Sequence, residues 1–242
     1  MRSHQVVETE ALILQRTPYS ESDWVVCLFA ERWGRISAIT PGARKSKQRY
    51  AGGLEPFHGL SVRLQSPSRG DMFHLQSSEI THPRHTLVSS LNAMNSAARA
   101  FHWLQRALPP MLPDSGTWAL TQTWLDALDN VSPTSARLAD ARAAEFGLHL
   151  LSLLGWALQL ERCVHCEKTC PSNRPAYLNL AAGGIVCRSC GGSGLILDPT
   201  LRAQLLSLDD NHLLDDKSGP NALRIVEDAF ALHAGIEKPQ TL

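Results

Sequence analysis

The chain has 242 residues, of which 43% are hydrophobic, and its 23 Lys and Arg residues balance its 23 Asp and Glu residues. This length suits one large or two modest domains, and the zero net charge argues against a globally basic nucleic-acid-binding protein. No run of about 18 apolar residues occurs, so we expect no membrane-spanning helix. We also expect no signal peptide among the first ten residues, which favours a cytoplasmic protein with reduced thiols.

The first eighty residues alternate between apolar and polar side chains, with the period of two that is typical of β-strands. Such a pattern predicts five strands, at residues 11–14, 24–30, 35–40, 60–65 and 72–80. Five short strands fit a small closed barrel such as an OB-fold. Other small barrels share this pattern, so the alternation alone cannot choose among them. Our prediction for residues 1–82 is an OB-fold nucleic-acid-binding domain.

After residue 82 the apolar residues recur every three or four positions, which predicts α-helices. The expected helices are 91–104, 118–128, 136–160, 201–208 and 221–236. Asp198 and Pro199 fit the N-cap and the first position of the fourth of these. The predicted fold class is thus α+β, with a five-stranded barrel followed by a helical domain over residues 83–242.

Two Cys-x-x-Cys pairs interrupt the helical domain, and a short hairpin is expected over residues 177–186 between them. Four thiolates in two tight pairs can close a tetrahedral shell around one Zn²⁺. This spacing predicts a zinc ribbon at about residues 161–192 with one structural ion, although free thiols or two disulfides are alternatives. Cys170 could compete as a ligand but lacks a partner at this spacing. The predicted ligands are Cys163, Cys166, Cys187 and Cys190.

An enzyme is the first alternative for this segment. His165, Glu167 and the second Cys pair match parts of the signature of zinc-dependent nucleobase deaminases. Val186 stands where that signature has Pro, however, and Cys163 would remain unused. No phosphate-binding loop or catalytic set occurs elsewhere, so we predict that the chain is not an enzyme. The second alternative is a zinc-ribbon module that binds another protein.

A basic loop follows the third predicted strand and places four positive charges within six residues. Such a cluster can neutralise the phosphates of a nucleic acid, or it can be a solvated loop with incidental charge. A five-stranded barrel favours the first interpretation, because that fold binds oligonucleotides. We expect Trp24 to lie in the core. The predicted DNA-binding residues are Arg16, Arg32, Arg35, Arg44, Lys45, Lys47, Arg49 and Tyr50.

Several short motifs, in this order, resemble those of the bacterial RecO family of recombination mediators. The likeness lies in Ala11 to Leu14, Ser20 to Asp23, Trp33-Gly34-Arg35, Gly42-Ala43-Arg44 with its basic followers, Leu54 to Phe57, Leu153 to Trp156, and Gly183 to Cys187. It covers residues 8–80 and 140–200 well and residues 85–135 hardly at all. The resemblance implies an OB-fold, a helical domain and, in many members, a four-cysteine zinc site.

The resemblance also implies a function in DNA repair through the RecFOR pathway, at the nucleoid in the cytoplasm. Members bind single- and double-stranded DNA, anneal complementary strands, and work with RecR to load RecA onto strands coated by single-stranded DNA-binding protein (SSB). RecO-like chains often have a basic residue shortly before the Phe at position 146, where this chain has Ala143, Ala144 and Glu145. We therefore expect Arg142 and Phe146 to bind the acidic SSB tail, more weakly than in such relatives.

Overall fold

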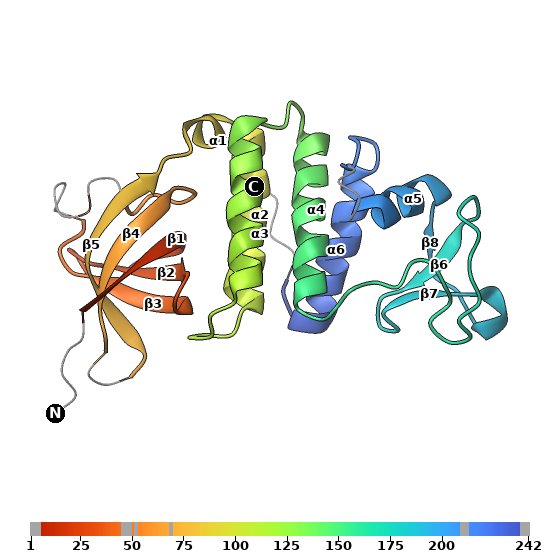
Figure 1. The fold of residues 1–242 in the computed structure, drawn as a ribbon, viewed down its shortest axis with the longest axis horizontal. Coiled ribbons are helices and arrows are strands. Elements are labelled where there is room, and N and C mark those ends of the chain that lie inside the picture. The colour runs from red at the N-terminus through yellow and green to blue at the C-terminus, as the bar shows by residue number, and fades with distance from the viewer. Residues whose placement is uncertain (1–5, 45–49, 51–52, 68–69, 209–212, 238–242) are drawn as a thin grey trace. The chain divides into compact units, whose positions relative to one another are not determined.

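The computed structural model describes all residues except 1–5, 45–49, 51–52, 68–69, 209–212 and 238–242 (Figure 1). The chain forms two compact units, residues 1–132 and residues 133–242. The predicted division at residue 82 follows the change from strands to helices, whereas these units follow packing and group three helices with the barrel. Within the described ranges, no helix combines the length and the apolar character that crossing a membrane requires.

The first unit begins with a closed barrel in the order β1-β2-β3-β5-β4 (Figure 1). Strands β3 and β5 pair in parallel, and the other four pairings are antiparallel. This five-stranded arrangement confirms the predicted OB-fold barrel. The strands are β1 (Val6–Pro18), β2 (Trp24–Ala30), β3 (Gly34–Thr40), β4 (Gly59–Gln65) and β5 (Met72–His82).

Strands β1 and β2 are buried on two sides, inside by the barrel core and outside by helices. Alternate residues such as Ile13, Leu28 and Ile36 fill the interior core. Phe29, one position after Leu28, lies outside this core and packs edge-on against Trp118, with 5.3 Å between ring centroids. A strand with both faces covered reads as a continuous apolar run, which explains the unbroken hydrophobic stretches in β1 and β2.

A buried arginine fastens the barrel to the helices of the first unit, which are α1 (His85–Ser89), α2 (Leu91–Ala107) and α3 (Ser115–Asn130). Arg84 is 1% exposed. Its Nε donates to Asp126 Oδ1 at 2.8 Å, and its two Nη atoms donate to Phe57 O at 2.9 Å and Gln122 Oε1 at 2.6 Å. The guanidinium therefore joins the segment before β4 to one face of α3.

The connection between α2 and α3 lies directly on β3. The backbone N–H of Met111 donates to Arg35 O at 2.8 Å, and Arg35 Nε donates to Leu108 O at 2.8 Å. Gly34 has a φ of 64°, and a Cβ atom there would overlap the carbonyl of Leu112. Glycine is required at this position both for the left-handed backbone and for the close approach of the two segments.

The second unit contains the remaining helices and a small sheet of three strands in the order β7-β6-β8. Helices α4 and α6 pack against each other, and Gly219 permits the approach, because a Cβ there would overlap the carbonyl of Arg137. The predicted hairpin is confirmed, while β8 was not predicted. The elements are α4 (Ala136–Leu153), β6 (Ala176–Asn179), β7 (Gly184–Val186), β8 (Leu195–Leu197), α5 (Pro199–Ser207) and α6 (Gly219–Ala234).

Helix α4 is shorter than the 136–160 segment predicted from the sequence, because it ends at Leu153. Gly155 takes a φ of 82°, and the N–H of Trp156 turns back to Leu151 O at 2.7 Å. A left-handed glycine followed by such a bond is a standard helix C-terminus. The apolar residues beyond Gly155 therefore lie outside the helix and lead into the ribbon.

Replacing Arg84 by Met should lower the free energy of unfolding by about 3 kcal/mol, because Asp126, Gln122 and Phe57 O lose their buried donor. Arg106→Met is the matched control, since Arg106 is exposed on α2 and should change stability by less than about 0.5 kcal/mol. Urea unfolding followed by tryptophan fluorescence measures both. Equal stabilities for the two variants would contradict the role given to Arg84.

Candidate metal centre and nucleic-acid interface

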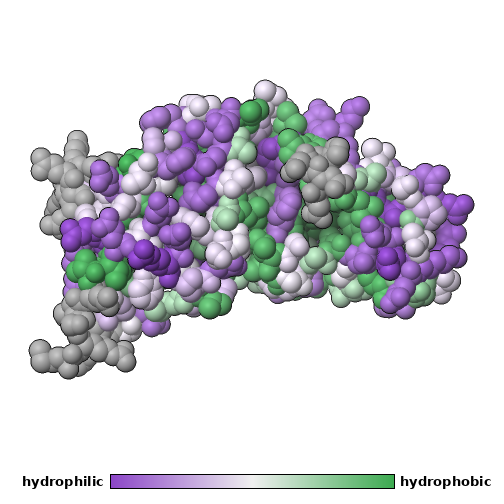
Figure 2. Space-filling view, in the orientation of Figure 1, coloured by the Kyte–Doolittle hydropathy of each residue, from purple (hydrophilic) through white to green (hydrophobic). Residues whose placement is uncertain are grey.

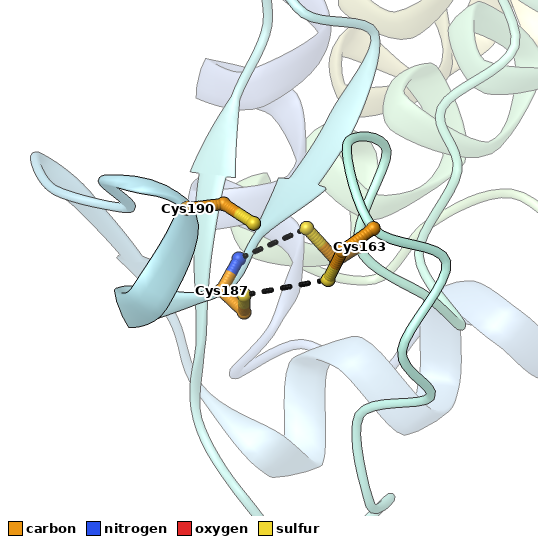
Figure 3. A group of neighbouring side chains, drawn as sticks. Cys163, Cys187 and Cys190 are labelled. Atoms are coloured by element: carbon orange, nitrogen blue, oxygen red, sulfur yellow. Dashed lines mark hydrogen bonds between the residues drawn. The ribbon is translucent and has the colours of Figure 1, made fainter.

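Four cysteine thiols converge at one end of the three-stranded sheet. Cys163 and Cys166 belong to the loop before β6, while Cys187 follows β7 and Cys190 ends a short 3₁₀ turn. Their four Sγ atoms all lie within 4.8 Å of one another, and those of Cys166 and Cys187 are 3.7 Å apart. Figure 3 shows the labelled thiols of Cys163, Cys187 and Cys190 pointing toward a common centre.

Tight backbone turns direct these thiols. Glu167 and Gly191 have φ values of 59° and 87°, and each follows a cysteine directly. The N–H of Cys187 donates to Cys163 Sγ at 3.3 Å, and with the N–H groups of Cys166 and His165 it lowers the pKa of Cys163 to about 6. Hydrogen bonding to Cys187 and Cys166 raises the pKa of Cys190 to about 12. Without a cation, the repulsion between neighbouring thiolates prevents all four thiols from ionising. A bound metal ion removes this restriction.

The sulfur spacing fits a tetrahedral metal site. Zn–S bonds of about 2.3 Å place neighbouring sulfurs about 3.8 Å apart in a tetrahedron, whereas a disulfide requires about 2.05 Å. The observed 3.7 Å matches the first value, and all six cysteines are free. The four cysteines can therefore hold one metal ion in a closed shell, which suits a structural rather than a catalytic metal.

The neighbouring candidates lie outside this group. His165, which a deaminase would use as a ligand, is exposed and is not among the four clustered residues. Cys163, which a deaminase would leave unused, is one of those four. Cys170 Sγ is directed to Pro171 O at 3.8 Å instead. The deaminase arrangement of one His and two Cys with an open position is therefore not formed by these residues.

A second buried arginine holds the segments that flank the first cysteine pair. Arg202 of α5 is 1% exposed. Its Nε donates to Leu160 O at 2.7 Å, and its Nη atoms donate to Cys170 O at 2.7 Å and Pro171 O at 2.8 Å. These bonds fix the entry and exit of the first cysteine loop against α5. No sequence pattern pointed to this residue.

On the barrel, two guanidinium groups lie over one tryptophan ring. The Cζ atoms of Arg16 and Arg44 are 5.5 Å and 5.6 Å from the ring centroid of Trp24. Arg16 also pairs with Glu55 at 2.8 Å, and Arg44 donates to Ser20 O at 2.8 Å. Trp24 is half-buried against the barrel core, so its prediction as a core residue missed the cationic side of its environment.

The other predicted DNA-binding residues have different surroundings. Arg32 is exposed, whereas Arg35 is half-buried beside Leu108. Tyr50 is 3% exposed and donates its hydroxyl to Leu75 O at 3.1 Å, so its ring serves the core and has no free face for a base. The three remaining predicted residues, Lys45, Lys47 and Arg49, lie outside the described residues.

Comparisons with known proteins cover both units. Residues 1–84 match the family model described as "Recombination protein O N terminal", and residues 88–239 match "Recombination protein O C terminal". The chain belongs to the RecO family. Its predicted membership is thereby confirmed, including for residues 85–135, where the motifs gave little indication.

Curated relatives named "DNA repair protein RecO" agree with the family match. The relative from Anaeromyxobacter sp. (strain K) is 31% identical over 219 residues, which are 89% of this chain and 84% of the relative. The relative from Desulfosudis oleivorans is 35% identical over 188 residues, covering 76% of this chain and 71% of the relative. That from Geobacter metallireducens is 29% identical over 197 residues, covering 81% and 78%. The chain is thus a RecO family DNA repair protein.

The two residues proposed for the SSB tail lie on α4. Phe146 is fully buried, so it offers no surface to a peptide. Arg142 is bound within the unit, because its Nη1 donates to Glu145 Oε2 at 2.8 Å and its Nη2 donates to Leu214 O at 2.7 Å. Glu145 Oε1 in turn accepts from the N–H of Leu214 at 2.6 Å. Arg142 and Glu145 together hold both polar backbone groups of Leu214.

This arrangement makes stability depend on pH. Burial raises the pKa of Glu145 from 4.5 to about 7, against the opposing effects of Arg142 and the Leu214 N–H. The folded state therefore takes up a proton that the unfolded state has released, and stability is lost as pH rises from about 5 to about 8, by at most about 3 kcal/mol.

Glu145→Gln should remove this part of the pH dependence in urea unfolding followed by helical circular dichroism. The exposed Glu161→Gln control should keep it; identical pH profiles for wild type and Glu145→Gln would show that Glu145 ionises normally.

The purified protein should contain one tightly bound metal ion per chain, measured by elemental analysis. Cys163→Ser should abolish this content and destabilise the ribbon, because metal binding at such sites contributes directly to folding. Cys170→Ser is the matched control, and its metal content should equal that of the wild type. Metal-free wild-type protein with unmodified thiols would contradict the site.

Proposed function

We propose that the protein is a recombination mediator that binds single- and double-stranded DNA, promotes strand annealing and, with RecR, helps load RecA onto SSB-coated single strands. The pairing of Arg16 and Arg44 over Trp24 on an OB-fold barrel is the single observation that carries the DNA-binding part. Membership of the RecO family supports the mediator part, together with action at the nucleoid in the cytoplasm.

The chemistry of this face suits a phosphate backbone. A guanidinium has five N–H donors in a planar fork that matches phosphate oxygens. Arg44 uses one of its side-chain nitrogens in bonding to Ser20 O, and Arg16 uses one in its bonds to Leu54 O and Glu55. Donors therefore remain for phosphate, while exposed Tyr19 can stack on a base. Arg32, Arg35, Lys45, Lys47 and Arg49 extend the proposed contact, whereas Tyr50 supports it from the core.

The proposed metal is Zn²⁺, bound by Cys163, Cys166, Cys187 and Cys190. A four-thiolate shell leaves no open position for substrate, so the ion would shape the ribbon and take no part in a reaction. This is consistent with a protein whose function is to bind and align strands. Neutralising the phosphates of two complementary strands reduces their mutual repulsion, which would promote annealing without catalysis.

The proposed partners are RecR, the SSB tail and, indirectly, RecA. For the acidic tail we propose the second unit, where Arg142, whose side chain is 16% exposed, supplies a cation and Phe146 supports α4 from within. Because Arg142 also holds Leu214, Arg142→Ala would affect stability as well as peptide binding. Calorimetry with a tail peptide therefore requires the unfolding curve of the same variant beside it.

Replacing Arg44, Lys45, Lys47 and Arg49 together by Ala should weaken binding to every DNA sequence. It should also lower the slope of log affinity against log salt by about 0.7 for each lost contact with a single strand. The matched control replaces four exposed arginines elsewhere, Arg63, Arg106, Arg137 and Arg224, and thus changes the net charge equally. Fluorescence anisotropy with a labelled oligonucleotide at several salt concentrations measures both. If the two fourfold variants bind alike, the basic loop makes no special contribution.

A further inference from the structure

A cavity of about 730 Å³ lies beside the four-cysteine cluster, within the second unit. One side of it is a platform formed across the small sheet. Val186, Tyr177 and Ile196 lie in register on the three adjacent strands, and all three line the cavity. The volume lies in the range of sites that bind small ligands, about 300–1,000 Å³.

The charged residues that line this cavity are all positive. They are Lys168, Arg174 and Arg188, each exposed, and no Asp or Glu occurs among the lining residues. The guanidinium of Arg188 lies 6.0 Å from the ring centroid of Tyr177 and donates to its hydroxyl at 3.1 Å. Figure 2 shows hydrophobic residues among hydrophilic ones on the visible face of this part of the chain. The three cations and Ile196 are exposed, Tyr177 is half-buried, and Val186 is 4% exposed.

The cluster itself does not account for this charge. Four thiolates with one divalent ion carry a net charge of −2, and Cys163 and Cys187 line the cavity. The three cations exceed this charge, so the cavity remains positive when the metal is bound. It is therefore complementary to an anion that also has an apolar, flat part.

We propose that this cavity is a second contact for single-stranded DNA, with a base on the Tyr177 platform and the flanking phosphates on Arg174, Arg188 and Lys168. The inference rests on the proposed DNA-binding function and extends it to the ribbon. A paired aromatic ring and guanidinium favour an unpaired base, since every base has a π-face that stacks. In a duplex the bases are already stacked and cannot enter.

The first test locates the contact directly. The full-length protein is irradiated with a thymidine oligonucleotide that carries 5-iodouracil, and the crosslinked peptides are identified by mass spectrometry. We expect crosslinks on Tyr177 or its neighbours in the cavity, in addition to residues of the barrel. Crosslinks confined to residues 1–132 would overturn the inference and leave the proposed function intact, whereas no binding of the oligonucleotide at all would overturn both.

The second test separates this contact from general charge. Arg174→Ala with Arg188→Ala should lower the salt slope by up to about 1.4, for two phosphate contacts. The matched control is Arg162→Ala with Arg137→Ala, which removes two exposed arginines outside the cavity and should leave the slope almost unchanged. Tyr177→Ala should weaken binding about tenfold, whereas Tyr177→Phe keeps the ring and should bind nearly as the wild type.

Every variant is compared at equal metal content, so that loss of the ribbon is not read as loss of the contact. Equal slopes for the cavity pair and its control would overturn the inference. A glutamate-rich peptide that removes the Tyr177 crosslink at lower concentration than unlabelled oligonucleotide would assign the cavity to an acidic protein partner, and would overturn it as well.

Discussion

Hydrogen bonding of two buried guanidinium groups to backbone carbonyls is the interaction on which both units depend. A charge removed from water is tolerated only when its donors are satisfied. Arg202 satisfies its donors on carbonyls of segments without regular structure, whereas Arg84 bonds one such carbonyl, Phe57 O, and two side chains of α3. Arg84 thereby orders the chain just before β4, which closes the barrel against β1. Arg202 orders the chain on both sides of the first cysteine loop.

The ribbon depends most strongly on its buried arginine. Its sheet consists of strands of four, three and three residues, which is too small to be stable alone. Arg202 holds the segments that flank the first cysteine loop, and the cysteine cluster holds the loop itself. The turn at Glu167, whose positive φ costs backbone energy, lies in the first cysteine loop, which Arg202 and the cysteine cluster both hold.

The sequence was most informative where a local pattern determines structure. Alternation located the five strands, although β1 (Val6–Pro18) is much longer than the predicted segment 11–14. The spacing of the cysteines predicted the cluster. Periodicity was less useful at the ends of elements and at single positions. It predicted that α4 continues past Gly155, and it could not show that Tyr50 points into the core. The burial of Arg84 and Arg202 was not predictable at all, because the partners of their guanidinium groups lie 27–42 residues away along the chain and nothing in the sequence distinguishes a buried arginine from an exposed one.

The contact between β3 and the connection from α2 to α3 has a consequence for how RecO chains can diverge. Gly34, Arg35 and residues 108–112 fit one another through a backbone hydrogen bond, the bond from Arg35 Nε to Leu108 O and the absence of a Cβ at Gly34, so their match depends on chain length as well as on these two residues. An inserted or deleted residue in this connection would move the carbonyl of Leu112 away from its position against Gly34. Length differences among family members should therefore accumulate in other loops, and this connection should serve as a fixed reference for aligning distant members.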